Sequence, residues 1–360
     1  MNRIVNFSAG PSTLPLSALQ ETAAELPDYR GAGMSLIEMS HRGKQYMAVQ
    51  SEAAALVKSL LGLSDRFTVL FLGGGATLQF SMVPLNLLGA GKSCDFTLTG
   101  AWAGKAFADA AKVGKVNVLF DGKAQNYTTL PDPTTLTVSP DAAYLHMTSN
   151  ETIGGIQWRD WPDTGAVPIV ADMSSDIMSR RLPLEKFGLI YAGAQKNLGP
   201  AGLALAIVRD DVLARCSDEL PAYLGYKIHA KNDSMYNTPP VFCVYMLGKT
   251  LRWLEALGGL DAAEALAEER SGLVYAAIDE SNGYYRCPVD PNVRSKMNVV
   301  WRLPSETLEK QFVAEAEARG LSGLKGHRSV GGCRASLYNA MPVEGAKALA
   351  DFMKAFAGRA

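Results

Sequence analysis

Two short segments of this chain carry residues that could do chemistry together. Residues 167–172 (VPIVAD) form an apolar run that ends on Asp172, and residues 192–197 (AGAQKN) carry Lys196, 24 positions after that aspartate. A lysine at the rim of a sheet can form a Schiff base with an aldehyde, and a nearby aspartate can keep a pyridine nitrogen protonated. The pairing suits pyridoxal phosphate, although charged residues also end strands for other reasons.

Two further segments combine histidine and arginine with glycine. Residues 40–43 (SHRG) contain His41 and Arg42, and residues 326–334 (GHRSVGGCR) contain His327, Arg328 and Arg334. Arginine binds carboxylate or phosphate oxygens through two parallel N–H groups, and glycine allows a ligand to approach closely. The pattern predicts an anion site, with solvated surface arginines as the alternative. No His pair has HxH or HxxxH spacing, so we expect no metal centre.

Two glycine-rich segments are expected to differ in whether they bind a phosphate group. Residues 72–77 (LGGGAT) follow a predicted strand and open a helix, and a helix N-terminus attracts phosphate. They lack the GxGxxG spacing of a dinucleotide site. Residues 89–93 (GAGKS) resemble the end of a nucleotide P-loop, but Asn86 stands where its first glycine belongs, and the segment leads into a strand. We therefore expect no ATP or GTP site there.

Two other segments have ordinary structural interpretations beside functional ones. Trp102 follows the end of a predicted strand, where an indole can stack on an aromatic ring, although core packing is the commoner role. Residues 236–240 (YNTPP) predict a turn before a helix.

The elements that must position these residues alternate between strand and helix. Strands are expected at 67–72, 93–97, 115–120, 143–148, 167–172, 189–195 and 201–209, with helices at 78–88 and 101–113 between them. This alternation predicts an α/β fold with a mostly parallel sheet. The connection at 196–200 is too short for a parallel return, so the last two strands should be antiparallel, with Lys196 in the tight turn.

The C-terminal part of the chain predicts a smaller α+β domain. Helices dominate 245–278, followed by a strand at 296–302 and a closing Ala-rich helix. We expect a large α/β domain at 16–257 and a small domain formed by 258–360 with 1–15.

Bulk composition limits the classes of function. The 360 residues are 48% hydrophobic and carry 35 Lys and Arg against 36 Asp and Glu, so no global field favours nucleic acid or a membrane surface. No apolar run approaches the length of a membrane span, and the N-terminus does not read as a secretory signal. The five scattered cysteines fit reduced thiols, and we expect a cytoplasmic protein.

Taken together, the motifs resemble the phosphoserine aminotransferase family, in the class-V aminotransferase group of fold-type I pyridoxal phosphate enzymes. The resemblance runs essentially end to end. Its motifs are residues 6–11 (NFSAGP), 40–43 (SHRG), 100–102 (GAW), 150–152 (NET), 172–175 (DMSS), 192–197 (AGAQKN), 236–240 (YNTPP), 326–332 (GHRSVGG) and 334–339 (RASLYN).

The resemblance implies a role for each of these residues. Lys196 would hold pyridoxal 5'-phosphate covalently and shuttle the substrate proton, and Asp172 would face the ring nitrogen. Trp102 would stack on the ring, and Thr152 would bond near its phenolic oxygen. The cofactor phosphate would be held by Ala76, Thr77, Gln195, Asn237 and Thr238. Because the last two come from the partner subunit in the family, the resemblance implies a homodimer.

For the substrate, the resemblance implies that Arg334 binds the α-carboxylate. The distal group would be received by His41, Arg42, His327 and Arg328. One departure is that some relatives have an arginine in the glycine-rich loop, where this chain has Ala76 and Thr77. The substrate phosphate would then depend more on Arg42 and Arg328 or on backbone amides.

The implied activity is ping-pong transfer of an amino group between glutamate/2-oxoglutarate and O-phosphoserine/3-phosphohydroxypyruvate, in serine biosynthesis. Whether 4-phosphohydroxythreonine, in pyridoxine biosynthesis, is also a substrate stays open. Another class-V enzyme is the nearest alternative, either a serine–glyoxylate aminotransferase or a cysteine desulfurase that uses Cys333. A nucleotide-dependent protein built on residues 89–93 is the alternative from a different class.

Overall fold

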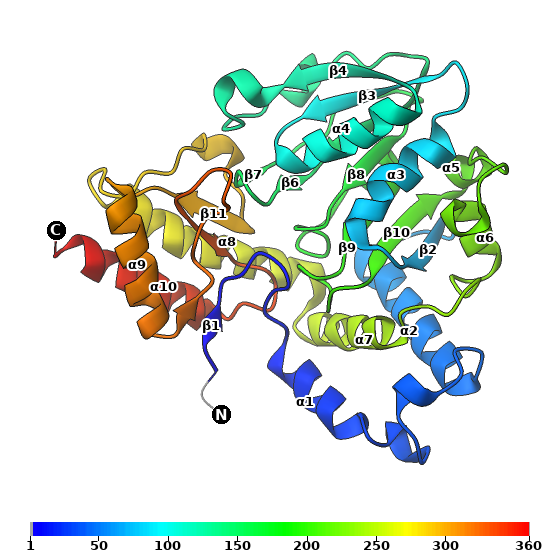
Figure 1. Ribbon diagram of the computed structural model, residues 1–360, viewed down its shortest axis with the longest axis horizontal. Helices are drawn as coiled ribbons and strands as arrows, with labels where there is room; N and C mark the ends of the chain where they lie inside the picture. The colour runs from blue at the N-terminus through cyan, green and yellow to red at the C-terminus, as the bar shows by residue number, and fades with distance from the viewer. Residues whose placement is uncertain (1–2, 360) are drawn as a thin grey trace.

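The computed structural model describes residues 3–359, and its largest element is a seven-stranded sheet (Figure 1). Its strands, in spatial order, are β2 (Phe67–Leu72), β10 (Ala204–Arg209), β9 (Phe187–Gly193), β8 (Ile169–Asp172), β5 (Ala142–Thr148), β3 (Ser93–Leu98) and β4 (Lys115–Asp121). β10 is antiparallel to both of its neighbours, and the other pairs are parallel. The α/β prediction, including the antiparallel pair formed by β9 and β10, is confirmed.

Helices cover both faces of this sheet. Along β9, Leu189 and Tyr191 face one side, while Ile190 and Ala192 face the other, because successive strand residues alternate. The first side packs on α3 (Gly75–Leu87), α4 (Ala101–Val113), α5 (Asp210–Ala214) and α6 (Tyr226–Lys231). The second packs on α2 (Lys44–Leu61), α7 (Val241–Ala256) and the start of α8 (Gly259–Asp279). Apolar residues on both faces explain why these strands read as continuous apolar runs.

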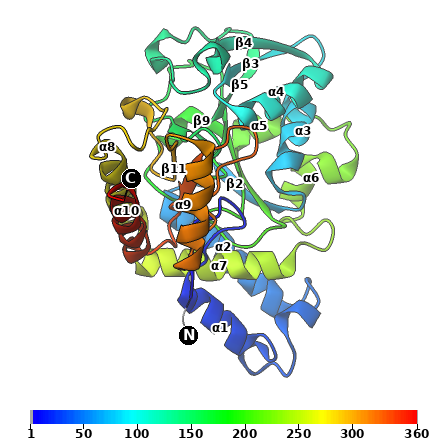
Figure 2. The same ribbon diagram turned by 60° about the vertical axis from the view of Figure 1, so that its left-hand side comes forward.

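A second hydrophobic cluster gathers the C-terminal elements around Phe7. It contains the end of α8 with β11 (Asn298–Trp301), α9 (Glu306–Ala318), β12 (Leu321–Ser322), β13 (Cys333–Ser336) and α10 (Val343–Ala357). The short strand β1 (Val5–Asn6) pairs in parallel with β12 and so ties the N-terminal segment to this cluster. Figure 2 shows α8, α9 and α10 gathered on one side of the molecule.

The first helix, α1 (Leu16–Glu25), projects beyond α7 at the bottom of both ribbon views (Figures 1 and 2). Two short 3-10 helices, η1 (Tyr29–Gly31) and η2 (Leu36–Glu38), connect it to α2. Within residues 3–359, no helix has the length and apolar character needed to cross a bilayer.

The carboxyl ends of β2, β3, β5, β8 and β9 lie at one edge of the sheet, because these strands run in the same direction. In α/β proteins this edge is where ligands bind. The segments that follow the strands carry Ala76, Trp102, Thr152, Asp172 and Lys196. The chain topology therefore brings together residues that are separated by as many as 120 positions in sequence.

Candidate active site

Lys196 and Asp172 line one cleft of about 410 Å³ at this edge. Asp172 is the last residue of β8, and Lys196 lies in the turn between β9 and β10. Their side chains are almost fully buried. Burial lowers the pKa of Lys196 and raises that of Asp172, and the opposite charge of each residue counters the shift of the other. A buried amine with a lowered pKa is suited to nucleophilic and proton-transfer chemistry.

Each group is held by specific hydrogen bonds. Lys196 Nζ donates to Thr152 Oγ1 at 2.6 Å. Asp172 Oδ1 accepts from the backbone N–H and the hydroxyl of Ser174, at 2.9 and 2.6 Å. Both bonds fall on the same oxygen, so Asp172 Oδ2 remains able to accept a proton donor in the cleft.

The glycine-rich segment forms the N-terminal end of α3 at the cleft. The helix begins at Gly75, earlier than the predicted residue 78, and no side chain caps it. Gly74 has a φ of 82°, which glycine adopts without strain. Ala76 and Thr77, in the first turn of the helix, line the cleft, and the N–H groups of a first turn have no acceptor within their own helix. A Cβ at Gly193 would lie 2.8 Å from Gln195 Oε1 and 3.4 Å from Ala76 N. Glycine at 193 therefore lets the Gln195 side chain lie close to the N-terminal end of α3, where a phosphate could bind.

Trp102, near the start of α4, presents its ring to the same cleft. Lys196 Nζ lies 5.1 Å from the centre of this ring. The indole N–H is buried and has no protein acceptor among the described residues. The indole is therefore a partner for a flat ring in the cleft.

These residues fit pyridoxal phosphate, the cofactor that the sequence motifs imply. The cleft offers an amine for its aldehyde, a carboxylate oxygen for its ring nitrogen, an aromatic face for its ring and an uncapped helix N-terminus for its phosphate. Asn237 and Thr238 do not line this cleft; both are exposed at the turn before α7.

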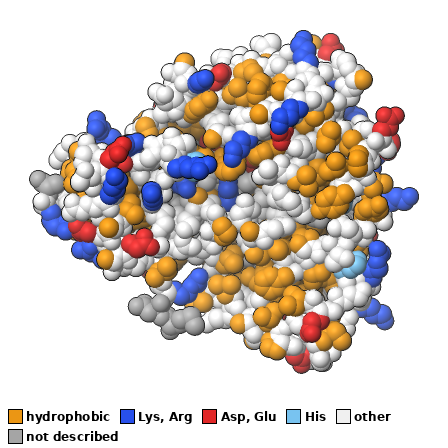
Figure 3. All heavy atoms as spheres, in the orientation of Figure 1, with side chains coloured by type: hydrophobic (Ala, Val, Ile, Leu, Met, Phe, Trp, Pro, Cys, Tyr) orange, Lys and Arg blue, Asp and Glu red, His pale blue; other side chains and the backbone are white. Residues whose placement is uncertain are grey.

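A second cavity of about 300 Å³ is lined by Arg334, His327 and Arg302, and no Asp or Glu lines it. Arg334 Nη1 donates to the carbonyl of Thr152 at 3.2 Å, so Thr152 bonds residues of both cavities. Burial lowers the pKa of His327, and the charges of Arg334, Arg328 and Lys105 add to this effect. Figure 3 shows Lys and Arg side chains in a band across the middle of this face. This surplus of cations suits an anionic ligand.

The structure does not bring all the predicted distal-group residues together within one chain. His327 and Arg328 lie in the loop beside the second cavity, whereas neither His41 nor Arg42 lines either cavity. Arg42 is exposed, just before α2.

The geometry argues against two of the alternatives, a cysteine desulfurase that uses Cys333 and a nucleotide site at residues 89–93. Cys333 is 1% exposed in β13, and burial raises its pKa, which is unfavourable for a mobile nucleophilic thiolate. Residues 89–92 form a turn that leads into β3, as predicted, and present no helix N-terminus to a nucleotide.

Three residues of the site were not singled out from the sequence. Ser174 orients Asp172, Glu151 accepts from the first N–H groups of α4, and Lys105 Nζ lies 4.3 Å from the centre of the Trp102 ring. Lys105 is three residues after Trp102, a spacing that places two side chains on one helix face. Ser174 and Glu151 lie within the motifs at 172–175 and 150–152, but those motifs carried no prediction of the two contacts.

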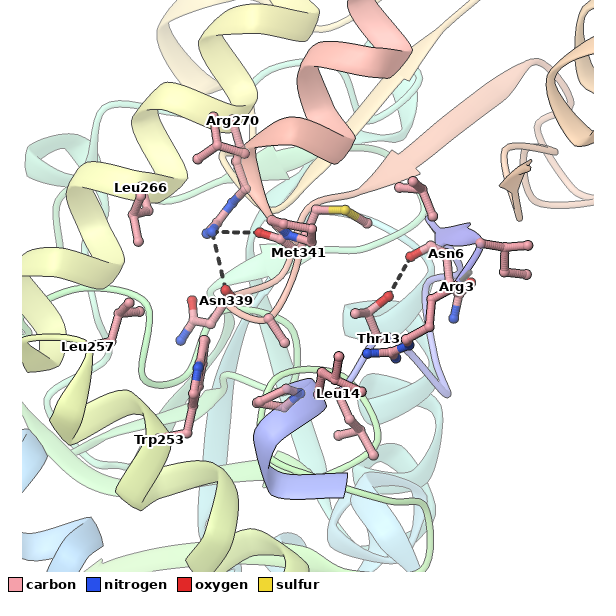
Figure 4. Close-up of a pocket in the computed structure, with 17 residues that line it drawn as sticks. Arg3, Asn6, Thr13, Leu14, Trp253, Leu257, Leu266, Arg270, Asn339 and Met341 are labelled. Carbon is pink, nitrogen blue, oxygen red and sulfur yellow. Dashed lines mark hydrogen bonds between the residues drawn. The ribbon is translucent and has the colours of Figure 1, made fainter. Parts of the chain in front are cut away.

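A third cavity, of about 470 Å³, lies next to the lysine turn and is mostly apolar (Figure 4). Two arginines line it, Arg3 and Arg270. Arg270 is 1% exposed and donates from Nη1 to the carbonyls of Asn339 and Met341, at 3.2 and 3.0 Å. The Asn339 N–H in turn donates to Asn197 Oδ1 at 2.9 Å. The wall of this cavity is therefore linked, through Asn339 and Asn197, to the turn that carries Lys196, and Arg270 contributes to that link through Nη1.

Comparison with known proteins gives a consistent result. Residues 4–349 match the family model described as Aminotransferase class-V. The phosphoserine aminotransferase of Desulfosudis oleivorans is 52% identical over 356 residues, which is 98% of each chain. The solved phosphoserine aminotransferase from Bacillus circulans subsp. alkalophilus superposes with a TM-score of 0.98, at 50% identity over 99% of both chains. The pyridoxal phosphate-bound enzyme from Trichomonas vaginalis gives 0.93, at 42% identity over 98% of this chain and 100% of the other.

Proposed function

Because the chain belongs to the class-V aminotransferase family and, within it, to the phosphoserine aminotransferases, we propose that the cleft at Lys196 is its pyridoxal phosphate site. The chain is a pyridoxal phosphate-dependent aminotransferase that exchanges an amino group between glutamate/2-oxoglutarate and O-phosphoserine/3-phosphohydroxypyruvate. The observation that carries the site assignment is the buried lysine facing a buried aspartate in one cleft beside an uncapped helix.

The roles of the cleft residues follow from their positions. When bound, pyridoxal phosphate supplies an electrophilic aldehyde carbon and a ring that withdraws electrons from the substrate Cα. Lys196 Nζ would hold the cofactor through its aldehyde and, when free, would move the substrate Cα proton. Asp172 Oδ2 would keep the ring nitrogen protonated, Thr152 would bond near the phenolic oxygen, and Trp102 would stack on the ring.

The remaining cofactor contacts serve its phosphate. Ala76 and Thr77 donate from the helix N-terminus, and Gln195 lies beside them. The absence of an arginine in this loop leaves more of the substrate phosphate to Arg328 and Arg42. The two amino donors then share one cationic region, because arginine accepts either a carboxylate or a phosphate.

Arg334 binds the substrate α-carboxylate, since its guanidinium is anchored on Thr152, the residue that also bonds Lys196. This arrangement places the carboxylate near the reacting Cα. His327 and Arg328 receive the distal group from the loop above. In His327, the Ser329 N–H donates to Nδ1 at 3.2 Å, so the neutral ring carries its proton on Nε2.

A homodimer completes the site. Arg42, Asn237 and Thr238 are exposed and lie away from the cleft of their own chain. The same two segments of the chain carry large hydrophobic side chains that are more than a third exposed: Met34, Ile37, Met47, Tyr236 and Phe242. Figure 3 shows hydrophobic side chains gathered in the region of α7. Such a patch is typical of an interface, and a twofold axis would bring each set of polar residues to the partner's cleft.

The hydrophobic clusters support a division into a large domain at 16–257 and a small domain formed by 258–360 with 1–15. The sheet and its helices form one cluster on each face of the sheet, and Phe7 joins the C-terminal elements in a separate cluster. Only the first residues of α8 belong to the sheet core. The five free cysteines are consistent with a reducing, cytoplasmic location.

Replacement of Lys196 tests the assignment. Lys196→Ala should abolish the yellow colour of the holoenzyme and lower turnover of phosphoserine with 2-oxoglutarate by roughly 10⁴-fold or more, because the residue both links the cofactor and moves the proton. Lys231→Ala, an exposed lysine on α6, is the control and should behave as wild type. Retained turnover in Lys196→Ala would refute the assignment.

A further inference from the structure

Glu151 is a fully buried acid that no step of the proposed reaction uses. It lies in the short strand β6 (Asn150–Glu151), which pairs with β7 (Ile156–Gln157), and it is 0% exposed. Its carboxylate accepts from the backbone N–H of Trp102 at 3.1 Å and of Ala103 at 2.9 Å. These are two of the first-turn N–H groups of α4, which have no partner within their own helix. The carboxylate therefore caps the helix that carries the stacking tryptophan.

Gly100 makes room for this contact. It is the N-cap residue of α4 and has no side chain to cap the helix itself. A Cβ built on Gly100 would lie 2.5 Å from Glu151 Cδ, closer than non-bonded atoms approach. The φ of Gly100 is 167°, which is ordinary extended backbone, so only the close approach of Glu151 requires glycine here.

The two neighbours of Glu151 also make hydrogen bonds to distant segments, and those of Thr152 reach the reacting groups. Thr152 accepts from Lys196 Nζ through its hydroxyl and from Arg334 through its carbonyl. Asn150 Nδ2 donates to Ser175 Oγ and Asn298 Oδ1, both at 2.8 Å. Two consecutive residues, Glu151 and Thr152, thus contact the tryptophan helix, the lysine and the substrate arginine, and Asn150 anchors the segment that carries them.

We propose that Glu151 is a positioning residue. By capping α4, it fixes the position of the Trp102 indole relative to Lys196, so that the cofactor ring is held between the indole and its other contacts in the orientation that the reaction needs. The inference rests on the proposed function, because it assigns the cofactor to the cleft between these two residues. Glu151 acts through Trp102 and does not itself touch the reacting atoms.

The cost of burying Glu151 supports a functional reason for it. Burial raises its pKa to about 7, and the N–H groups of Ala103 and Trp102 oppose this rise. A serine or asparagine at the N-cap would cap α4 without placing a carboxylate among other buried charges. The structure instead uses an acid from a segment that also holds Lys196.

The test measures cofactor binding by the apoprotein as well as activity. Glu151→Gln keeps the size of the side chain but offers a single acceptor oxygen to two N–H groups. We expect pyridoxal phosphate to bind this apoprotein at least tenfold more weakly, as followed by quenching of tryptophan emission. We also expect the visible circular dichroism of the bound cofactor to fall in amplitude, because that signal depends on how the ring is held.

The matched control is Asp95→Asn. Asp95 is another carboxylate with 0% exposure, and it accepts from Ser139 N at 2.6 Å and Asn117 Nδ2 at 2.8 Å, away from the cleft. This change should lower stability while leaving cofactor affinity and dichroism at wild-type values. Glu151→Asp, which keeps both oxygens on a shorter stem, should recover part of the affinity that Glu151→Gln loses.

Gly100→Ala tests the same contact without altering Glu151, and it serves if Glu151→Gln does not fold. The added Cβ displaces the carboxylate and should reproduce the weaker binding and dichroism. Gly104→Ala, in the same helix with no atom within 4 Å of its added Cβ, should not. Wild-type affinity and dichroism in both Glu151→Gln and Gly100→Ala would overturn the proposal. A wild-type protein that never binds the cofactor at Lys196 would instead refute the proposed function, and this inference with it.

Discussion

The cofactor cleft and the surface that surrounds it are built in opposite ways. Lys196 and Asp172 in the cleft, and Glu151 beside it, are buried. Each is held by a hydrogen bond to a defined protein group: Thr152 for Lys196, Ser174 for Asp172 and the first turn of α4 for Glu151. On the surface, Arg42 and Arg328 are exposed and lie in loops. The contrast indicates that one chain preorganises the buried groups, whereas in the proposed dimer the choice of anion would depend on exposed cations, some of them from the partner chain. Preorganised groups in a dry site contribute most to catalysis.

After the loss of Lys196 itself, the largest effect is expected where the cleft loses a charge without losing its shape. Asp172→Asn keeps an oxygen for the Ser174 bonds but removes the negative charge that faces the ring nitrogen. Turnover should fall by about 10²–10³-fold, as for other preorganised electrostatic groups. Steady-state rates at saturating cofactor measure this. Ser174→Ala, which leaves the charge in place, should lose far less turnover. Equal losses in the two variants would show that the charge of Asp172 is not what the cleft contributes.

The second prediction concerns the partner's contribution. Lys196→Ala and Arg42→Ala homodimers should each have low activity, because each lacks one essential group in both sites. If Arg42 serves the partner's cleft, subunit exchange forms heterodimers with one intact site. A randomly exchanged equal mixture should then recover about a quarter of wild-type activity.

The mixture is measured after dilution from mild denaturant, with each variant treated alone as the control. No recovery above the sum of the separate variants would show that Arg42 acts within its own chain. That result would contradict the proposed dimeric site.

A smaller effect is expected for the loop beside the second cavity. Arg328→Ala removes one charge-assisted contact, worth about 1.5–3 kcal/mol, so KM for phosphoserine should rise about tenfold or more. The KM for glutamate should rise less, because a carboxylate carries less charge than a phosphate. Arg319→Ala, an exposed arginine next to α9, is the control. An equal rise for both substrates would mean that the loop does not distinguish the two anions.

The last prediction concerns the titration of Glu151, which should change the stability of the apoprotein. Its pKa rises on folding from 4.5 to about 7, so the stability it contributes is fully present below pH 4.5 and is lost as the pH rises through about 7. Glu151→Gln does not titrate. The free energy of unfolding of wild type relative to this variant should therefore fall by up to about 3 kcal/mol over that range. A pH-independent difference would contradict the burial argument.

The fold could be predicted largely from local patterns. The apolar runs at β2, β5, β8 and β9 are strong signals because both faces of these strands are buried. The short connection after β9 was enough to predict its antiparallel partner. The pairing of β10 with β2, which lie about 130 residues apart, had no local signal. The start of α3 was placed three residues late because glycines do not read as helix.

The site was predictable where chemistry and motif coincide, as at Lys196, Asp172 and Trp102. It was not predictable where a side chain accepts a hydrogen bond from the backbone of a segment that is distant in sequence. Glu151 bonds α4 across 48 positions, and Asn197 bonds Asn339 across 142. Such contacts depend on tertiary structure, and the residues involved have no distinctive spacing.

The central claim is that Lys196 holds the cofactor covalently, opposite Asp172. Borohydride reduction of the protein saturated with pyridoxal phosphate, followed by tryptic mapping, tests it most directly. Modification of Lys196 blocks cleavage there, so the label should appear on the single peptide that spans residues 187–209. A cleaved, unlabelled Lys196, with label on other lysines or on none, would contradict the account.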